Sequence, residues 1–376
     1  MSGTSMDGLD IALCRISGSG RNTRLKVEQF QTAPYTARFR SQLKAIFAQP
    51  TISQQQLCTL NAIVGRTHGT LVNNALTTWG IANHQVDLVA SHGQTVFHAP
   101  QWQTGHADEP NSTLQIGDGD HVAVSTGIIT VTDFRQKHIA MGGEGAPLAV
   151  YGDYLLFSAE TENRILLNIG GIANFTYLPA STTGQQAFAT DTGPGNTLMD
   201  QYMQQYFGRE MDYEAQVALS GKVHPDLLRA LQKNRFFSLP FPKTTGPELF
   251  NLEYIHKAQQ DSATASLEHR DVMATLTAFS AIMITRAIQE ATGDTHNVHL
   301  YLSGGGLHNP MLRHLILQGL PHVTTYPFEQ LKLSPDAKEA ALFAVLANET
   351  VAGHASNTAA IGYSPRCCMG KICFPE

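Results

Sequence analysis

The sequence of 376 residues is poor in charge of either sign and in long apolar runs. Asp, Glu, Lys and Arg make up 15% of it, and the formal net charge is -6. No stretch approaches about 18 consecutive apolar residues, so no membrane span is predicted. The acidic balance lacks the basic surplus of a nucleic-acid-binding protein. With no basic, apolar leader visible at the start, we expect a cytoplasmic protein with neither a nucleic acid nor a membrane as partner.

Cysteine is also scarce and its spacing is uninformative. The five cysteines are an odd number, and no C-x-x-C pair occurs although three of them lie close together: Cys14, Cys58, Cys367, Cys368 and Cys373. This pattern gives neither a disulfide framework nor a paired metal site. Reduced thiols in a cytosolic protein are therefore the expectation.

Several catalytic signatures are missing. No glycine-rich loop ends in Gly-Lys-Ser/Thr, and no G-x-G-x-x-G opens a helix near the start, which argues against a P-loop NTPase and a nicotinamide dehydrogenase. No G-x-S-x-G elbow occurs, so an α/β serine hydrolase is disfavoured. The 16 histidines include no H-E-x-x-H pair or other metal spacing.

What is present indicates a folded α/β protein. Hydrophobic residues make up 42% of a chain long enough for two domains. Strand-like and helical segments alternate, which predicts a mainly parallel α/β sheet. The expected strands are residues 9–16, 86–90, 128–132, the hairpin 165–178 and 298–303, and the expected helices are 38–49, 53–79, 271–292, 310 onward and 337–348.

Local signals add four detailed expectations. Asp7-Gly8 is typical of a tight hairpin turn. Gly65 or Gly69 is expected to break the helix of residues 53–79. Asp271 is expected to cap the helix that follows it, and Asn309 to cap the next helix, with Pro310 in its first position.

Glycine turns are the main functional signal. Four of them are predicted at strand ends, at residues 3–8, 142–145, 193–195 and 304–306. Backbone N–H groups reach a polyphosphate most closely where glycine leaves room. Any one of these turns is more simply read as a tight turn, but four together favour nucleotide binding. In the first, hydroxyl groups could donate to phosphate oxygens and Asp7 could hold hydrated Mg²⁺ through water.

Asp191 is the acid that we single out, because it precedes Gly193-Pro194-Gly195 in a predicted turn before a helix. A carboxylate with so little bulk around it could take a proton from a hydroxyl group or a water molecule. An aspartate that merely caps a helix or forms an Asx turn is the simpler reading. His92 stands at a predicted strand end, where a purely structural histidine is the simpler interpretation. Glu339 lies on a predicted helix, where a solvent-exposed helix face is the simpler interpretation.

Seven segments together resemble one family, anhydro-N-acetylmuramic acid kinase. They occur in that family's order and span nearly the whole chain: GTSMDG, SHGQT, TDFRQKHIAMGGEGAPL, LLNIGGIANFTYLP, DTGPGNTLMD, LSGGGLHNP and SPDAKEAALFA. The resemblance implies two actin-like, ribonuclease-H-like lobes with ATP and substrate in the cleft between them. We expect an N-terminal lobe of residues 1–130 and 355–376 and a C-terminal lobe of residues 131–354. The family resemblance also allows a homodimer.

The resemblance further implies the reaction and its residues. Such enzymes open the 1,6-anhydro bridge of anhydro-N-acetylmuramic acid with water and phosphorylate O6, using ATP and Mg²⁺, in peptidoglycan recycling. Asp191 matches the catalytic base. The ATP-contacting positions would be Gly3, Thr4, Ser5, Met6, Asp7, Gly8, Leu9 and Asp10, with Gly304, Gly305 and Gly306 near the nucleotide. Arg135, Glu339 and His92 are placed on the sugar side, where Arg135 suits a carboxylate such as the lactyl group.

One departure and three alternatives accompany this interpretation. Family members carry a strand ahead of GTSMDG, which would pair with residues 9–16; without it, we expect low stability and weak activity. The alternatives are a kinase for another sugar, a phosphohydrolase on the same scaffold, and a non-catalytic ATP-driven clamp or filament protein like Hsp70 or actin. Asp191 distinguishes a kinase from the clamp or filament protein, because a clamp needs no base for sugar chemistry.

Overall fold

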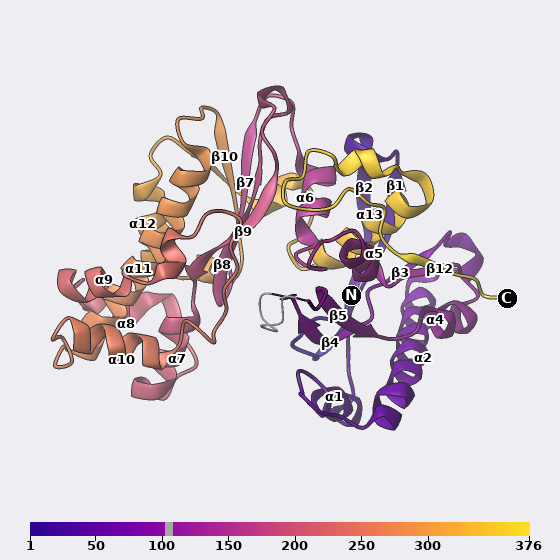
Figure 1. Cartoon of the computed structure of the whole chain (residues 1–376), viewed down its shortest axis with the longest axis horizontal. Coiled ribbons are helices and arrows are strands. Elements are labelled where there is room, and N and C mark those ends of the chain that lie inside the picture. The colour runs from indigo at the N-terminus through magenta and orange to yellow at the C-terminus, as the bar shows by residue number, and fades with distance from the viewer. Residues whose placement is uncertain (102–107) are drawn as a thin grey trace. The chain divides into compact units, whose positions relative to one another are not determined.

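The chain forms two compact units with separate sheets. The computed structural model describes residues 1–101 and 108–376. Unit 1 comprises Met1–Phe157 and Lys332–Glu376, and unit 2 comprises Ser158–Leu331 (Figure 1). The expected lobe boundaries, at residues 130 and 354, both fall inside unit 1. The chain stays in unit 1 past residue 130 because the strand there is held between two others of that unit.

The described residues of unit 1 form three small sheets and the helices that pack on them. Its strands are β1 (Gly8–Ser17), β2 (Arg24–Pro34), β3 (Val89–Ser91), β4 (Gln94–Ala99), β5 (Ser112–Ile116), β6 (Thr130–Thr132) and β12 (Lys371–Cys373). Its helices are α1 (Ala37–Lys44), α2 (Gln54–Trp79), α4 (Gly119–Thr126), α5 (Phe134–Ala140), α6 (Ala149–Phe157) and α13 (Lys338–Ala352). The sheets are β1-β2, β12-β6-β3 and β4-β5.

Unit 2 is built on one five-stranded sheet of order β11-β10-β7-β8-β9. Its strands are β7 (Asn163–Ile169), β8 (Ile172–Leu178), β9 (Phe188–Pro194), β10 (Val298–Ser303) and β11 (Thr324–Pro327). Its helices are α7 (Thr197–Phe207), α8 (Gln216–Ser220), α9 (Pro225–Leu231), α10 (Leu252–Asp261), α11 (His269–Thr292) and α12 (Pro310–Gly319).

The topology of unit 2 confirms the predicted lobe type and corrects the predicted strand direction. Strands β7, β8 and β9 form an antiparallel meander, and β10 and β11 run parallel to β7. Three antiparallel strands followed by two parallel to the first is the ribonuclease-H-like arrangement. The expectation of a mainly parallel sheet was wrong, because the Gly170-Gly171 turn reverses the chain after β7 and pairs β8 antiparallel to it.

Helix α11 is the core helix of unit 2. It contacts α7, α8, α9, α12 and β9 (Figure 1). By length and composition it could cross a membrane, but 83% of its most apolar window is buried inside the protein. Apolar residues all around a helix are typical of one enclosed by a core. The helix begins at His269, and Asp271 does not cap it; its carboxylate accepts a hydrogen bond from the backbone of Lys222 instead.

Helix α2 shows why two glycines can lie inside a helix without breaking it. The helix is continuous from Gln54 to Trp79, so the expected break was wrong. A side chain at Gly65 would approach the backbone oxygen of Asp118 to 2.6 Å, and one at Gly69 would approach the side chain of Ser125 to 2.8 Å. Both glycines therefore allow close packing of α2 against α4.

Of the remaining local predictions, the helix cap at Asn309 is confirmed and the hairpin turn at Asp7-Gly8 is wrong. Asn309 caps α12, accepting a hydrogen bond from the Leu312 N–H group, with Pro310 in the first turn, as predicted. Asp7-Gly8 is not a hairpin turn: β1 begins at Gly8, and residues 18–23 connect it to β2. All five cysteines are free thiols. The C-terminal tail has a structural role, since β12 adds an antiparallel strand to β6.

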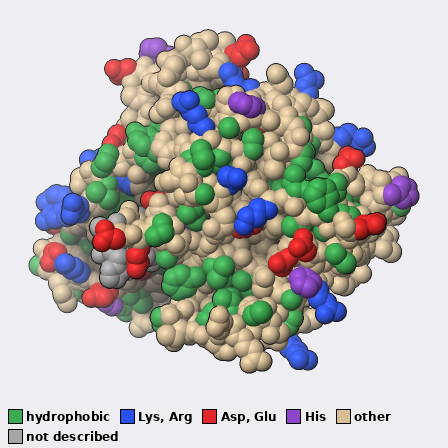
Figure 2. Space-filling view, turned by 45° about the vertical axis from the view of Figure 1, so that its right-hand side comes forward, with side chains coloured by type: hydrophobic (Ala, Val, Ile, Leu, Met, Phe, Trp, Pro, Cys, Tyr) green, Lys and Arg blue, Asp and Glu red, His purple; other side chains and the backbone are tan. Residues whose placement is uncertain are grey.

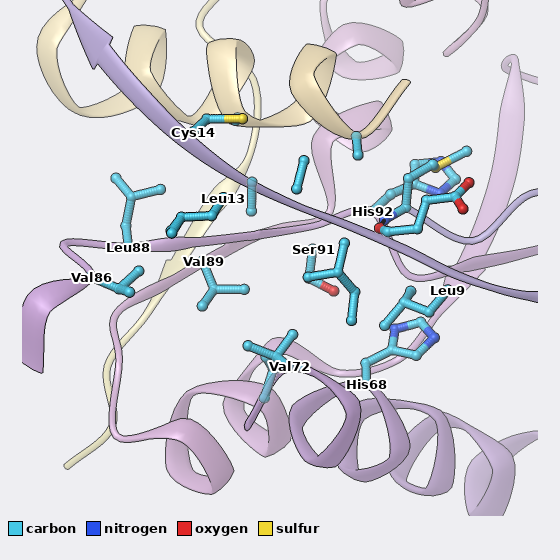
Figure 3. A pocket seen from close by; sticks show the side chains of 18 of the residues that line it. Leu9, Leu13, Cys14, His68, Val72, Val86, Leu88, Val89, Ser91 and His92 are labelled. Carbon is cyan, nitrogen blue, oxygen red and sulfur yellow. Dashed lines mark hydrogen bonds between the residues drawn. The ribbon is translucent and has the colours of Figure 1, made fainter. Parts of the chain in front are cut away.

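One edge of β1 borders a cavity of about 250 Å³ in unit 1. In Figure 3, β1 passes over the cavity, α2 lies below it with His68 and Val72, and Leu88, Val89, Ser91 and His92 line it from the chain around β3. Within the described residues, β1 pairs along its length with β2 alone. On the cavity side, Met1 exchanges two backbone hydrogen bonds with Asp10, and Ser2 bridges to Gln94 in parallel.

We therefore expect an extended segment placed ahead of Met1 to stabilise unit 1. It would continue the Met1–Asp10 pairing and meet the backbone groups of β1 and β3 that border the cavity. A fused segment of six alternating valines and threonines should raise the midpoint of thermal unfolding by about 5 °C. A fused segment of the same length made of glycine and serine is the control, and equal midpoints for both would contradict the expectation.

Candidate active site

The turn that precedes β1 presents polar groups to solvent. The Met6 N–H group donates to the carbonyl of Gly3 across 3.3 Å, and Thr4, Ser5 and Asp7 are exposed. Ser5 Oγ donates to Asp7 Oδ1 across 2.7 Å, and this hydrogen bond is the main reason why the pKa of Asp7 lies below its ordinary value. Asp7 thus offers an exposed, ionised carboxylate beside two hydroxyl groups, and one carboxylate with water and phosphate oxygens suits Mg²⁺.

A buried network fastens this turn to the first residue of β4. Ser2 Oγ donates to Gln94 Oε1 across 2.5 Å, and Gln94 Nε2 donates to the carbonyl of Gly3 across 3.2 Å. The Tyr35 hydroxyl group donates to Ser2 Oγ across 2.8 Å. The turn therefore shares its anchor, Gln94, with the segment that carries His92.

In unit 1 the structure brings His92 and Arg135 into contact, and Glu339 acts electrostatically on Arg135. Arg135, on α5, donates through Nε to His92 Nε2 across 2.9 Å and through a terminal nitrogen to the carbonyl of Gly145 across 2.7 Å. His92 Nδ1 lies 3.0 Å from the carbonyl of Gly93. Since a carbonyl can only accept, Nδ1 carries the proton and Nε2 accepts from Arg135, which defines the tautomer of His92.

His92 and Arg135 differ in their charge at neutral pH. Burial, and next the charge of Arg135, hold the pKa of His92 well below its ordinary value, so this imidazole is neutral. Burial lowers the pKa of Arg135 to about 10, against the opposing effect of Glu339. Arg135 therefore remains a cation at neutral pH, beside a neutral histidine and within the field of the exposed Glu339. Such a guanidinium group suits recognition of an anionic or polar ligand.

Asp191 lies on strand β9 of unit 2, three residues before its end. The expected turn at this position was wrong, because pairing with β8 continues through Pro194. The carboxylate is not a helix cap; Oδ2 accepts a hydrogen bond from the backbone N–H of Thr245 across 2.8 Å. Burial raises the pKa of Asp191 to about 6; the Thr245 bond opposes this shift, and the like charge of Glu248 adds to it. This carboxylate is ionised at neutral pH and is a stronger base than an ordinary aspartate.

Three glycine segments of unit 2 meet at the end of β7. The backbone N–H groups of Gly195 and Asn196 donate to the carbonyls of Gly171 and Gly170 across 2.8 and 2.9 Å. Gly304 has φ +93°, and a side chain there would approach the Ile169 carbonyl to 2.6 Å. Gly305 is exposed, with nothing within 4 Å of where a side chain would lie. The glycines thus bring backbone together at one end of the sheet.

Several residues that contact these sites belong to no sequence motif, so the sequence does not indicate their role. Thr190, Lys243 and Thr245 surround Asp191, and Gln94 and Tyr35 hold the Gly3–Gly8 turn. Each acts through a backbone group or a buried hydroxyl or amide, and such contacts depend on the fold rather than on any short motif. Within the described residues, no group of three His, Cys, Asp or Glu side chains could hold a metal ion.

The arrangement can be compared with known proteins. The sequence pattern described as anhydro-N-acetylmuramic acid kinase matches residues 1–375. The chain belongs to the anhydro-N-acetylmuramic acid kinase family. A relative of that name from Pseudoalteromonas atlantica is 51% identical over 379 residues, covering 100% of this chain and 94% of that protein. Another from Caldanaerobacter subterraneus is 35% identical over 376 residues, covering 99% of this chain and 95% of that protein.

The family match runs over residues 1–375 and so includes both units. The relative from Pseudoalteromonas translucida, 48% identical over 383 residues, likewise covers 100% of this chain. Charged side chains of both signs lie scattered over the face of the kinase-family chain that Figure 2 shows.

Replacing Arg135 by Lys tests the cluster of unit 1. An ammonium group cannot serve both His92 Nε2 and the Gly145 carbonyl in the geometry of a guanidinium group. We expect Arg135→Lys to lower the free energy of unfolding by about 1–2 kcal/mol, measured by denaturant unfolding. The reverse exchange on the exposed face of the same helix, Lys137→Arg, should change it by less than about 0.5 kcal/mol. Equal effects of the two exchanges would contradict the assignment.

Proposed function

We propose that the protein is a cytoplasmic ATP-dependent kinase. It opens the 1,6-anhydro ring of anhydro-N-acetylmuramic acid with water and phosphorylates O6, giving N-acetylmuramic acid 6-phosphate and ADP in peptidoglycan recycling. Family membership over residues 1–375 supports this reaction. The observation that carries the mechanism is the half-buried carboxylate of Asp191, whose Oδ2 accepts a hydrogen bond from Thr245 and whose pKa is raised to about 6.

Asp191 is proposed as the general base. Thr245 occupies Oδ2, which leaves the other carboxylate oxygen to accept a proton from water. The water oxygen then forms a bond to C1 of the sugar as the bond between C1 and O6 breaks. The second proton of the water stays on the new hydroxyl group at C1. A base with a pKa near 6 is ionised at neutral pH and accepts this proton more readily than an ordinary aspartate.

The oxygen freed from C1 is proposed as the nucleophile of the phosphoryl transfer, which belongs to the same catalytic event. O6 forms a bond to the γ-phosphorus of ATP while the bond to the ADP oxygen breaks. Phosphoryl transfer of this kind depends on positioning and on neutralising the charge of the phosphate oxygens. The sum is sugar, water and ATP giving the 6-phosphorylated sugar, ADP and one proton.

The turn of residues 3–10 is proposed to contact the ATP phosphates: Gly3, Thr4, Ser5, Met6, Asp7, Gly8, Leu9 and Asp10. Its exposed hydroxyl groups can donate to phosphate oxygens, and Asp7 would hold Mg²⁺ through water. Mg²⁺ bound there would supply positive charge to the phosphates. In unit 2, the backbone of Gly304, Gly305 and Gly306 is proposed to approach the nucleotide, which the open space around Gly305 supports.

The cluster of unit 1 is proposed to bind the sugar. Arg135 keeps its charge and is oriented by His92 and Gly145, so its remaining donors suit the carboxylate of a lactyl group. Glu339 is exposed and can accept hydrogen bonds from sugar hydroxyl groups. His92 is proposed to act at the sugar side as a neutral imidazole.

Asp191→Asn should abolish sugar phosphorylation while ATP binding is retained. Asparagine keeps the size of the side chain but cannot accept the proton, so we expect a loss of turnover of at least about 10³-fold. The measurement is ADP release with the anhydro-sugar, together with calorimetric binding of ATP. Asp200→Asn is a matched control, since Asp200 also has its pKa raised to about 6 by burial but lies on helix α7. Unchanged turnover in Asp191→Asn would remove Asp191 from the mechanism.

A further inference from the structure

The backbone on the open side of β9 is held by a loop distant in the sequence. The Asp191 N–H group donates to the carbonyl of Lys243 across 2.9 Å, so this loop is hydrogen-bonded to the backbone of the edge strand β9. Two residues later, the Thr245 N–H group donates to the Asp191 carboxylate. The loop of residues 243–245 therefore touches Asp191 at both its backbone and its side chain.

Thr190 fastens this loop to the strand. Its hydroxyl oxygen accepts a hydrogen bond from the Lys243 N–H group across 3.0 Å and lies 3.2 Å from the Lys243 carbonyl, to which it donates. Thr190 is 4% exposed, so no solvent replaces these bonds if the hydroxyl group is lost. The Lys243 backbone is thus held to β9 by the Asp191 backbone and by the buried Thr190 hydroxyl group.

The Lys243 side chain fastens the loop from the opposite end. Its ammonium group donates to the carbonyls of Phe237 and Leu239 across 3.3 and 3.2 Å. It also lies 5.1 Å from the ring centroids of Phe236 and Phe241. The two carbonyls and the two ring faces stabilise this cation. Lys243 is only 8% exposed, so its ammonium group makes these contacts in the protein interior.

We propose that Thr190 and Lys243 are positioning residues for the Asp191 carboxylate. Together they hold the loop of residues 243–245 so that the Thr245 N–H group binds one carboxylate oxygen and leaves the other for the proton to be accepted. The proposal deepens the function proposed above, on which the catalytic role of Asp191 rests. The contacts themselves do not depend on that role, so the two can be tested apart.

Removing the Thr190 hydroxyl group should loosen the bond from Thr245. That bond favours the ionised carboxylate and opposes the effects of burial and of Glu248, so its loss raises the pKa of Asp191 above about 6. Thr190→Val keeps the shape of the side chain and removes the hydroxyl group, whereas Thr190→Ser keeps the hydroxyl group. Lys243→Met removes the anchor at the other end and should act in the same direction as Thr190→Val.

The test is a carbon-13 NMR titration of the Asp191 carboxyl group in the full chain. The signal is assigned by its disappearance in Asp191→Asn. We expect a higher pKa in Thr190→Val and in Lys243→Met, and the unsubstituted protein's value in Thr190→Ser. An unchanged pKa in both Thr190→Val and Lys243→Met would overturn the proposal, whatever the activity of these variants.

The pH profile of kcat with the anhydro-sugar separates this proposal from the proposed function. In the unsubstituted protein, activity should rise with pH through about pH 6, as Asp191 loses its proton. In Thr190→Val this limb should move to higher pH, with kcat about tenfold lower at neutral pH and KM unchanged. A moved NMR titration with an unmoved kcat profile would support the positioning role and reject Asp191 as the base.

Discussion

A carboxylate that is partly shielded from water becomes a stronger base as long as it can still ionise, and the environment of the half-buried Asp191 meets both conditions. Burial raises its pKa, and one backbone hydrogen bond from Thr245 keeps that rise moderate. The position on a paired strand, rather than in a turn, limits the movement of the side chain. The chemistry proposed for the molecule depends on this balance between burial and one hydrogen bond.

The glycines support this arrangement by letting backbones approach one another. In unit 2, the segments around Gly170, Gly195 and Gly304 meet at the end of β7, while Gly305 stays open. In unit 1, the corresponding device is a turn held by Gln94 and Ser2, from which the Asp7 carboxylate projects. Both units thus combine firmly held backbone with exposed groups that a phosphate could contact.

The sequence predicted those features that short patterns encode. The Ile165–Leu178 hairpin and the Asn309 cap appear as expected. Errors arose where tertiary packing overrides a local signal. Gly65 and Gly69 suggest a helix break, yet they allow contact with α4. Gly193-Pro194 after Asp191 suggests a turn, yet pairing with β8 extends the strand through Pro194. Thr190 and Lys243 were missed because their contacts join residues some fifty positions apart.

The central claim is that one catalytic event both opens the ring and phosphorylates O6. It is tested most directly by counting products after incubation with ATP and the anhydro-sugar. The account predicts one newly formed reducing end, carrying phosphate on O6, for each ADP released, and no ADP release above background with ordinary hexoses. ADP release with ordinary hexoses at a similar rate, or phosphorylated sugar without a new reducing end, would contradict it.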